Sequence, residues 1–293
     1  MTLCRACPRN CGVDRAAGKF GVCSVGERIL VNRAAPHFGE EPCISGERGS
    51  GTVFFSGCNL RCVFCQNHEI SRAETGKAVS EDELCDILLR LQDDGVHNIN
   101  LVTPTHYTRQ LVRVLEKAKL KIPVAWNSSA YESVEQLRRL EGLVQIYMPD
   151  YKFADASLAQ RYCAAPDYPQ TALAAIKEMY RQRGAFRLDD DGMMQSGVLI
   201  RHLIMPGSAE NTLRVIDAIE DNFPSDGIIF SLMSQYTPMP GLEKFPELQR
   251  TVSADEYDRC ASYFDFSDIE YGFTQSIESA TEEMIPDFDG TGV

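Results

Sequence analysis

The regular alternation of short apolar runs with helical patterns is the feature that most constrains the fold of this chain. Runs of strand length occur in order at residues 51–57, 98–103, 122–126, 143–148, 197–205 and 227–233. Helical patterns separate them, and one more lies near residues 254–264. Strands that alternate with helices predict a parallel sheet with right-handed crossovers. Six such units form either an open doubly wound sheet or a partial barrel, and both bind ligands at the carboxyl ends of the strands.

The helix predicted after the first run has clear signals at both ends. Ser80 and Glu83 form the pattern of a capping box, which marks a helix start. Apolar residues then recur at helical spacing, namely Leu84, Ile87, Leu88 and Leu91. Gly95 follows, and glycine is typical of the position just after a helix.

Composition and charge exclude several classes of protein. The chain has 293 residues, of which 44% are hydrophobic and 24% charged, as in ordinary globular proteins. It has no run of about 18 apolar residues that would span a bilayer, and residues 1–10 lack the apolar stretch of a signal peptide. A net charge of −13 argues against nucleic-acid binding, because phosphate contacts need clustered Lys and Arg. We therefore expect a cytoplasmic protein with no membrane and no nucleic-acid partner.

Cysteine is dense near the N-terminus. Eleven cysteines are unusual for a reducing compartment, where such density indicates metal binding more often than disulfides, and eight of them lie in the first quarter of the chain. Residues 1–50 show little periodicity and need a metal or the main domain for order. Residues 51–240 carry the strand–helix units. Residues 241–293 form a helical tail with a polar end that we expect to be frayed.

A loop with three cysteines follows the first predicted strand. The stretch SGCNLRCVFCQN (56–67) contains Cys58, Cys62 and Cys65. Iron–sulfur cubanes are normally held by four thiolates, so three leave one iron without a protein ligand. An open coordination position is how a metal site binds a small molecule. The spacing of the three cysteines departs from that of zinc sites. A zinc knuckle and cysteines that only pack in the core are the alternatives. The neighbouring Phe64 would shield a cluster from solvent.

The other predicted strands also end in polar residues, where a packed core would not require them. The second ends in TPTHY, the third in Asn127 and Ser128, the fourth in Asp150 and Lys152, and the sixth in Gln235 and Tyr236. In the fifth, Arg201 and His202 are adjacent, so the pleat sends one inward and the other outward.

The loop and its placement resemble the radical S-adenosylmethionine (SAM) superfamily, in which three cysteines hold a [4Fe–4S] cluster and SAM chelates the fourth iron. More narrowly, CPRNCGVDR, EEPCISG, GSGTVFFSGCNLRCVFCQN and LVTPTHY resemble an uncharacterised branch homologous to pyruvate formate-lyase activating enzyme. The resemblance covers about residues 4–240. It implies an α/β fold, a partial (β/α)6 TIM-like barrel of the radical SAM type at 51–240, with a Cys-rich N-terminal metal-binding extension at 1–50 and a C-terminal helical tail at 241–293.

The resemblance also implies a reaction. A [4Fe–4S] cluster cleaves SAM reductively to a 5′-deoxyadenosyl radical, which abstracts hydrogen from the substrate, and a flavodoxin- or ferredoxin-type protein donates the electron. The substrate implied is a glycine of a partner protein, which makes the chain a glycyl-radical-enzyme activating enzyme. A small molecule or another peptide is the alternative substrate. A non-catalytic iron–sulfur electron carrier is the alternative from another class.

Several further site residues are carried over by resemblance. Asp150 and Lys152 match the D-x-K element that contributes to the SAM site of activases, Asn127 and Ser128 match the third-strand polar position, and His202 matches the fifth-strand position. Activases usually carry a Gly-Gly-Glu motif after the second strand, whereas this chain has VTPTHY. Thr103, Thr105 and His106 are the candidates to replace it.

A second group of cysteines precedes the barrel. Cys4, Cys7, Cys11 and Cys23 make four ligands, which is a closed set. Such a set binds structural zinc or a second [4Fe–4S] cluster, and either would order this segment against the barrel. The spacing does not choose between these metals, and it also allows that the four bind none.

Overall fold

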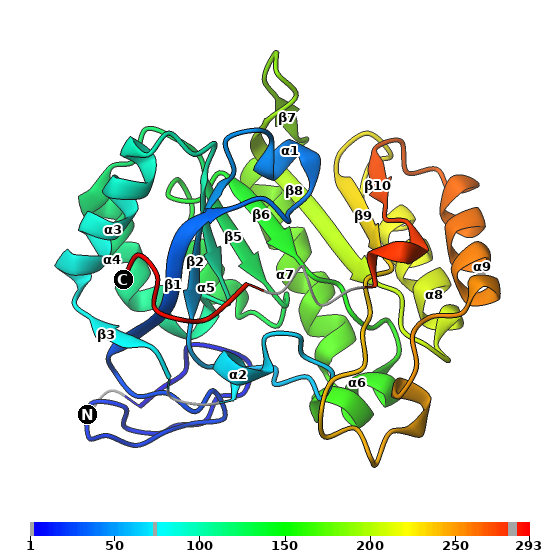
Figure 1. Cartoon of the computed structure of the whole chain (residues 1–293), viewed down its shortest axis with the longest axis horizontal. Helices are drawn as coiled ribbons and strands as arrows, with labels where there is room; N and C mark the ends of the chain where they lie inside the picture. The colour runs from blue at the N-terminus through cyan, green and yellow to red at the C-terminus, as the bar shows by residue number, and fades with distance from the viewer. Residues whose placement is uncertain (1–2, 73–74, 281–285) are drawn as a thin grey trace.

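The computed structural model describes residues 3–72, 75–280 and 286–293. Within these ranges ten strands form one sheet in the order β10-β9-β8-β6-β5-β4-β2-β1-β3, and β7 pairs with β8 (Figure 1). The strands are β1 Ile29–His37, β2 Ser50–Phe55, β3 Lys77–Val79, β4 Ile99–Val102, β5 Val124–Ser128, β6 Ile146–Pro149, β7 Arg187–Leu188, β8 Met194–Leu203, β9 Ile229–Met233 and β10 Gly272–Thr274. The α-helices are α1 Pro42–Ser45, α2 His68–Ser71, α3 Glu81–Asp93, α4 Thr108–Ala118, α5 Val134–Arg138, α6 Ala156–Cys163, α7 Tyr168–Arg183, α8 Ala209–Glu220 and α9 Ala254–Asp265. Short 3-10 helices lie at Thr105–Tyr107, Pro246–Leu248 and Ile277–Ser279.

The order of the parallel strands decides between the two architectures that the sequence left open. From β2 through β4, β5, β6, β8 and β9 to β10, each strand pairs in parallel with the next. A doubly wound sheet would reverse its strand order at a switch point, and this sheet does not. The predicted α/β partial barrel of the radical SAM type is therefore confirmed.

Helix α3 forms as its end signals predict. Ser80 Oγ accepts a hydrogen bond from the Glu83 N–H at 3.2 Å, and Glu83 Oε2 accepts one from the Ser80 N–H at 2.8 Å. Together these bonds satisfy two of the N–H groups that a helix start leaves free, and such caps stabilise a helix by about 1 kcal/mol. Gly95 has a φ of 86° just after the helix, which L side chains rarely adopt.

The sheet extends into both segments that flank the predicted barrel. β1 pairs antiparallel with β2, and β10 pairs parallel with β9. Residues 286–293 lie along β1, where the Ala34 N–H donates to the Thr291 carbonyl at 2.9 Å. The expectation that this polar end is frayed is therefore wrong. The division at residues 50 and 240 stays a prediction, because the sheet itself does not stop there.

The two ends of the barrel differ in polarity. Inward-facing residues near the amino ends of the strands form an apolar cluster that α1 covers with Ile44; its other members include Ala125, Ile146, Met148 and Leu199. The loop leading to α2 lies at the opposite, carboxyl ends (Figure 1). Among the helices that the structure describes, none is long and apolar enough to cross a membrane.

Candidate functional site

The three-cysteine loop, residues 56–67, is here called the core loop. Its thiols Cys58, Cys62 and Cys65 line one cavity of about 210 Å³ at the carboxyl ends of the strands. Polar residues from neighbouring strand ends line the same cavity, namely Thr103, Asn127, Ser128, Asp150, Lys152 and Arg201. The structure therefore brings most of the residues singled out in the sequence to one place.

Hydrogen bonds to α6 and to Arg72 hold the core loop in place. The Val63 N–H donates to the Tyr162 carbonyl at 2.9 Å. The guanidinium of Arg72 donates to the carbonyls of Cys62 and Val63 at 2.8 and 2.9 Å. A buried aromatic group stands behind the loop, where Phe64 packs edge to face on Tyr162 with ring centroids 6.2 Å apart. This wall limits access of water to the thiols.

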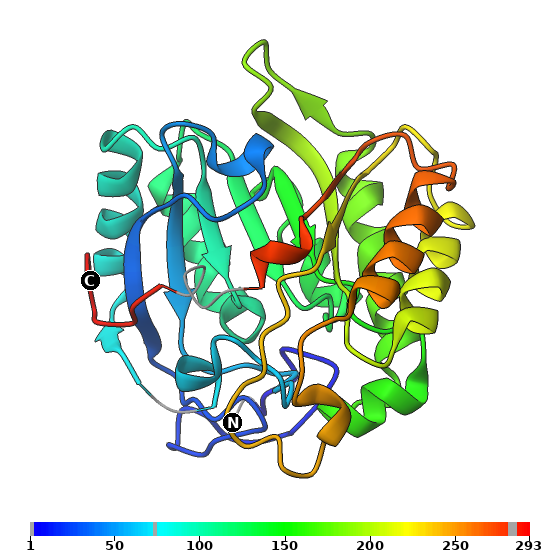
Figure 2. The same ribbon diagram turned by 45° about the vertical axis from the view of Figure 1, so that its right-hand side comes forward.

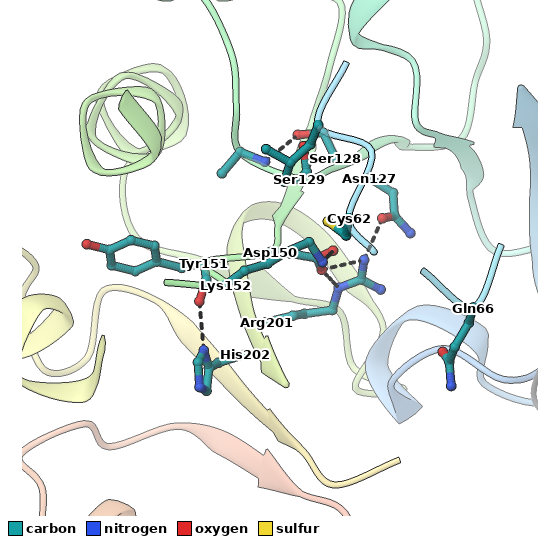
Figure 3. A network of polar contacts seen from close by, with 12 residues as sticks. Cys62, Gln66, Asn127, Ser128, Ser129, Asp150, Tyr151, Lys152, Arg201 and His202 are labelled. Carbon is teal, nitrogen blue, oxygen red and sulfur yellow. Dashed lines mark hydrogen bonds and ion pairs between the residues drawn. The ribbon is translucent and has the colours of Figure 1, made fainter. Parts of the chain in front are cut away.

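Charged groups alternate in sign along one wall of the cavity. Lys152 Nζ donates to Asp150 Oδ2 at 2.7 Å, and Arg201 Nε donates to Asp150 Oδ1 at 2.9 Å. Arg201 Nη2 donates to Asn127 Oδ1 at 2.5 Å (Figure 3). Its Nη1 donates to Glu40 Oε2 at 2.9 Å. Each of these ions therefore has an opposite charge beside it, as buried ions require.

The pKa values follow from this pairing. Burial acts to raise the pKa of Asp150, but Arg201 and Lys152 outweigh it, and the pKa lies below its usual value. Burial likewise acts to lower the pKa of Lys152, but Asp150 and the nearby thiol of Cys62 outweigh it, and this pKa is raised. Both groups therefore stay charged at neutral pH.

Sequence reasoning missed Glu40 and Glu41. Glu40 lines the cavity and receives Arg201. Glu41 is partly buried, its buried Oε2 has no hydrogen-bond partner among the described residues, and desolvation raises its pKa. Both lie in the irregular segment before α1, where no periodicity marks a residue as inward-facing. The only available signal was the motif EEPCISG, which contains them.

The structure corrects the prediction for the fifth predicted strand, β8. His202 points away from the cavity, where Nδ1 lies 2.7 Å from the Tyr151 carbonyl and Nε2 lies 2.9 Å from Thr212 Oγ1 (Figure 3). Burial lowers the pKa of His202 to about 4, so the ring is neutral. Arg201 enters the cavity instead, because the pleat places adjacent residues on opposite faces.

The turn after β4 contains the three candidates to replace the Gly-Gly-Glu motif, and it places them differently. Thr103 lines the cavity with a φ of 59°, a left-handed conformation that is unusual for a β-branched residue. Thr105 Oγ1 instead donates to Glu132 at 2.7 Å, and His106 Nε2 lies 2.7 Å from the Ser56 carbonyl. Of the three, Thr103 alone lines the cavity. Strained backbone of this kind gathers at functional sites.

A fourth thiol lies beside the core loop. Cys163 Sγ, at the end of α6, is 3.4 Å from Cys62 Sγ, and both residues are buried. Cys163 does not line the cavity, so it lies behind Cys62 as seen from the ligand side. No sequence signal predicts this contact, because the two residues are 101 positions apart.

The second cysteine group also assembles. Cys4, Cys7, Cys11 and Cys23, here called the tetrad, line one small cavity of about 10 Å³ together with His106. The segment that carries them lies under the carboxyl ends of the strands, next to the core loop (Figures 1 and 2).

The three thiols of the core loop fit the ligand set of a cluster that keeps one iron open. Within residues 3–72, 75–280 and 286–293, no three His, Cys, Asp or Glu side chains converge at the distances of a single metal ion. In a cubane each thiolate binds a different iron, so its ligands stand further apart than those of one ion. Burial, then the neighbouring Cys62 and Cys65, raises the pKa of Cys58 to about 12, and binding of a metal group would release that proton.

Comparison with known families gives the class of protein. The radical SAM superfamily model matches residues 52–183, which contain the core loop, Asp150 and Lys152. Over residues 52–183 the chain therefore matches the radical SAM superfamily, and this similarity supports a radical SAM enzyme. The family implies a [4Fe–4S] cluster and SAM as cofactors.

Individual relatives add the extent of the likeness. An uncharacterized protein of Methanocaldococcus jannaschii is 29% identical over 266 residues, covering 87% of this chain and 72% of the relative. SuiB of Streptococcus suis, solved bound to S-adenosylmethionine, matches with a TM-score of 0.52 at 18% identity, over 75% of this chain and 48% of SuiB. Methylornithine synthase (PylB) matches with a TM-score of 0.51 at 15% identity, over 83% of this chain and 72% of that protein. This chain spans about half of SuiB, and at these identities the two structures share the fold alone.

Proposed function

We propose that Cys58, Cys62 and Cys65 hold a [4Fe–4S] cluster, and that the enzyme uses SAM to abstract hydrogen from a glycine of a glycyl-radical enzyme. The observation that carries the SAM site is that the three thiols open onto the same cavity as the Asp150, Lys152 and Arg201 network. An electron carrier needs no such open and charged cavity. A cluster held by these three thiols would pass one electron from an external donor to the sulfonium of SAM, and cleavage of SAM would yield methionine and a 5′-deoxyadenosyl radical.

The residues of the cavity complement the charges of SAM. The ammonium of Lys152 suits the SAM carboxylate, and Asp150 fixes its position at 2.7 Å. The carboxylates of Asp150 and Glu40 suit the SAM ammonium. Asn127 and Ser128, at the end of β5, offer hydrogen bonds to the ribose hydroxyls or the adenine.

The size of the cavity supports a macromolecular substrate. Small-molecule sites commonly measure about 300–1,000 Å³, whereas this cavity measures about 210 Å³. SAM alone would fill it, so the substrate must present its hydrogen at the mouth. A peptide loop with glycine at its tip, which has no side chain to obstruct approach, meets this requirement. A small molecule or another peptide is the second candidate.

The first experiment tests the radical chemistry. The protein is reconstituted with iron and sulfide without oxygen, reduced with dithionite in place of a flavodoxin- or ferredoxin-type donor, and given SAM. We expect 5′-deoxyadenosine from the wild type and none from Cys62→Ala. Cys85→Ala, which removes a buried thiol on α3, is the control and should retain the product. No nucleoside from a fully loaded wild type would refute the enzyme proposal and favour the electron carrier.

A second experiment tests the substrate class. Unactivated pyruvate formate-lyase is added as the probe, and electron paramagnetic resonance is recorded after the reaction. The doublet of a glycyl radical, formed with one nucleoside per radical, supports the activase. Nucleoside without a protein radical contradicts activation of this probe and favours the small-molecule alternative.

A further inference from the structure

We propose that Cys4, Cys7, Cys11 and Cys23 bind a [4Fe–4S] cluster of their own, and that this cluster fixes Arg9 against the core loop. The site is distinct from the SAM cavity and does not depend on the function proposed above. It would make the N-terminal segment an iron–sulfur module that orders the catalytic loop.

The four thiols surround one space, and the backbone around them is adapted to it. The Val22 N–H donates to Cys11 Sγ at 3.4 Å, just as the Leu60 N–H donates to Cys58 Sγ at 3.4 Å in the core loop. Backbone hydrogen bonds to sulfur are a usual feature of iron–sulfur sites. Gly21 permits the close approach, because a Cβ there would lie 2.9 Å from Cys11 Sγ.

The geometry favours a cluster over zinc. Four thiolates on one zinc ion lie about 2.3 Å from it, which places them about 3.8 Å apart and leaves no space at the centre. Among the described residues, no three of the possible ligands converge on a single-ion position. The same is true of the core loop, whose family implies a [4Fe–4S] cluster.

Arg9 links the two cysteine groups. It lies between Cys7 and Cys11 in the sequence. Its guanidinium donates to two carbonyls of the core loop, Asn59 at 2.9 Å and Leu60 at 3.2 Å. It also donates to two carbonyls at the end of α6, Cys163 at 2.7 Å and Ala164 at 2.5 Å.

The segment before β1 has a very small apolar core. Its buried hydrophobic residues are Ala6, Cys23 and Val25. A metal group bound by four thiolates supplies the folding free energy that so small a core lacks. Loss of that group would release Arg9, and with it one clamp on the core loop.

The decisive experiment removes the core ligands and leaves the tetrad. The triple variant Cys58→Ala, Cys62→Ala, Cys65→Ala is reconstituted without oxygen, and its iron, sulfide and zinc are measured beside a Mössbauer spectrum. We expect about four irons and four sulfides per chain. Zinc without sulfide, or a folded variant with no metal, would overturn the proposal. Since the triple variant has no SAM cluster, failure of the proposed reaction would not affect this result.

The wild type gives an independent measure if the triple variant does not fold. About eight irons and eight sulfides per chain support the proposal, and about four irons with one zinc overturn it.

The clamp is tested by Arg9→Ala, with Arg5→Ala as the control, because Arg5 is an exposed arginine of the same segment. We expect Arg9→Ala to keep the tetrad cluster but to lose core iron to a chelator about tenfold faster, since each of its bonds comes from a charged donor. An unchanged rate of loss from Arg9→Ala would refute the clamp and leave the metal site standing.

Discussion

The core loop and the tetrad both hold cysteine thiols around a cavity, and they differ in how they do so. Both show a backbone N–H bond to sulfur, and neither group converges on a single-ion position in the described part of the chain. They differ in what completes the cavity. Three thiols of the core loop share a cavity of about 210 Å³ with charged side chains from several strands, whereas the four thiols of the tetrad line a cavity of only about 10 Å³. In our proposals, three thiols make a site that takes a ligand, and four thiols make a site that holds a segment in place.

Arg201 tests whether the charged wall is what distinguishes the core cavity. Arg201→Met would leave Glu40 and Asp150 without their shared partner, and breaking a buried ion pair costs about 3–5 kcal/mol in the free energy of unfolding. Denaturant unfolding of the metal-free protein measures this.

The matched control is Arg214→Met, because Arg214 also joins two carboxylates, Asp155 and Glu210, but is half exposed, and neither carboxylate is buried. We expect it to cost about 1 kcal/mol or less. Equal losses in the two variants would contradict the view that the network of Arg201 is a buried one.

A substitution of Lys152 tests whether the core cavity binds SAM. Lys152→Met removes the cation that we assign to the SAM carboxylate, and a hydrogen bond to a charged group contributes about 1.5–3 kcal/mol, so SAM should bind about 10- to 200-fold more weakly. Equilibrium binding of SAM to the reconstituted protein measures this. Lys117→Met, at an exposed pair with Asp82, should leave binding unchanged. Unchanged affinity in Lys152→Met would remove Lys152 from the SAM site.

These contacts show how far the sequence predicts the molecule. The six strand–helix units were predictable because strands buried on both faces appear as apolar runs. β1 was not, because it lies in a cysteine-rich segment that shows little periodicity. The core cysteines and the Asp150–Lys152 pair were found because each motif is local in the sequence. The sequence could not decide between Arg201 and His202, because the run 197–205 is apolar on both faces and does not fix which residue points inward.

Gly57 tests whether the two cysteine groups are packed together. A Cβ at Gly57 would lie 2.5 Å from the Cys23 carbonyl, and its φ is 81°. Gly57→Ala should therefore cost the strain of a left-handed residue, about 1–2 kcal/mol, and in addition displace Cys23. Gly95→Ala is the control, because its φ is 86° and nothing lies within 4 Å of the added Cβ. Thermal unfolding compares the stability of the two variants. Equal losses of stability would mean that the tetrad segment moves away from the added Cβ at no cost.

Substitution of Cys163 should have the smallest of the effects predicted here, a shift in the midpoint potential of the core cluster. With a cluster on Cys62, the Cys163 thiol at 3.4 Å is placed to donate a hydrogen bond to that sulfur, and no equivalent fifth thiol lies in the tetrad cavity. Hydrogen bonds to the sulfurs raise the potential of a cluster because they stabilise its reduced, more negative state. A net contribution of about 0.5–1.5 kcal/mol corresponds to about 20–60 mV for one electron, so Cys163→Ala should lower the midpoint potential of the core cluster by that amount.

Two further variants separate the hydrogen bond from packing. Cys163→Ser keeps a donor and should restore part of the potential, whereas Cys260→Ala removes another buried thiol and should not change it. A potentiometric titration followed by electron paramagnetic resonance measures all three. An unshifted potential in Cys163→Ala would mean that the thiol only fills space behind the core loop. A shift that Cys163→Ser reverses would instead mean that α6 sets the potential of the core cluster through the side chain at position 163. That side chain does not line the cavity, so it alters the potential without touching SAM.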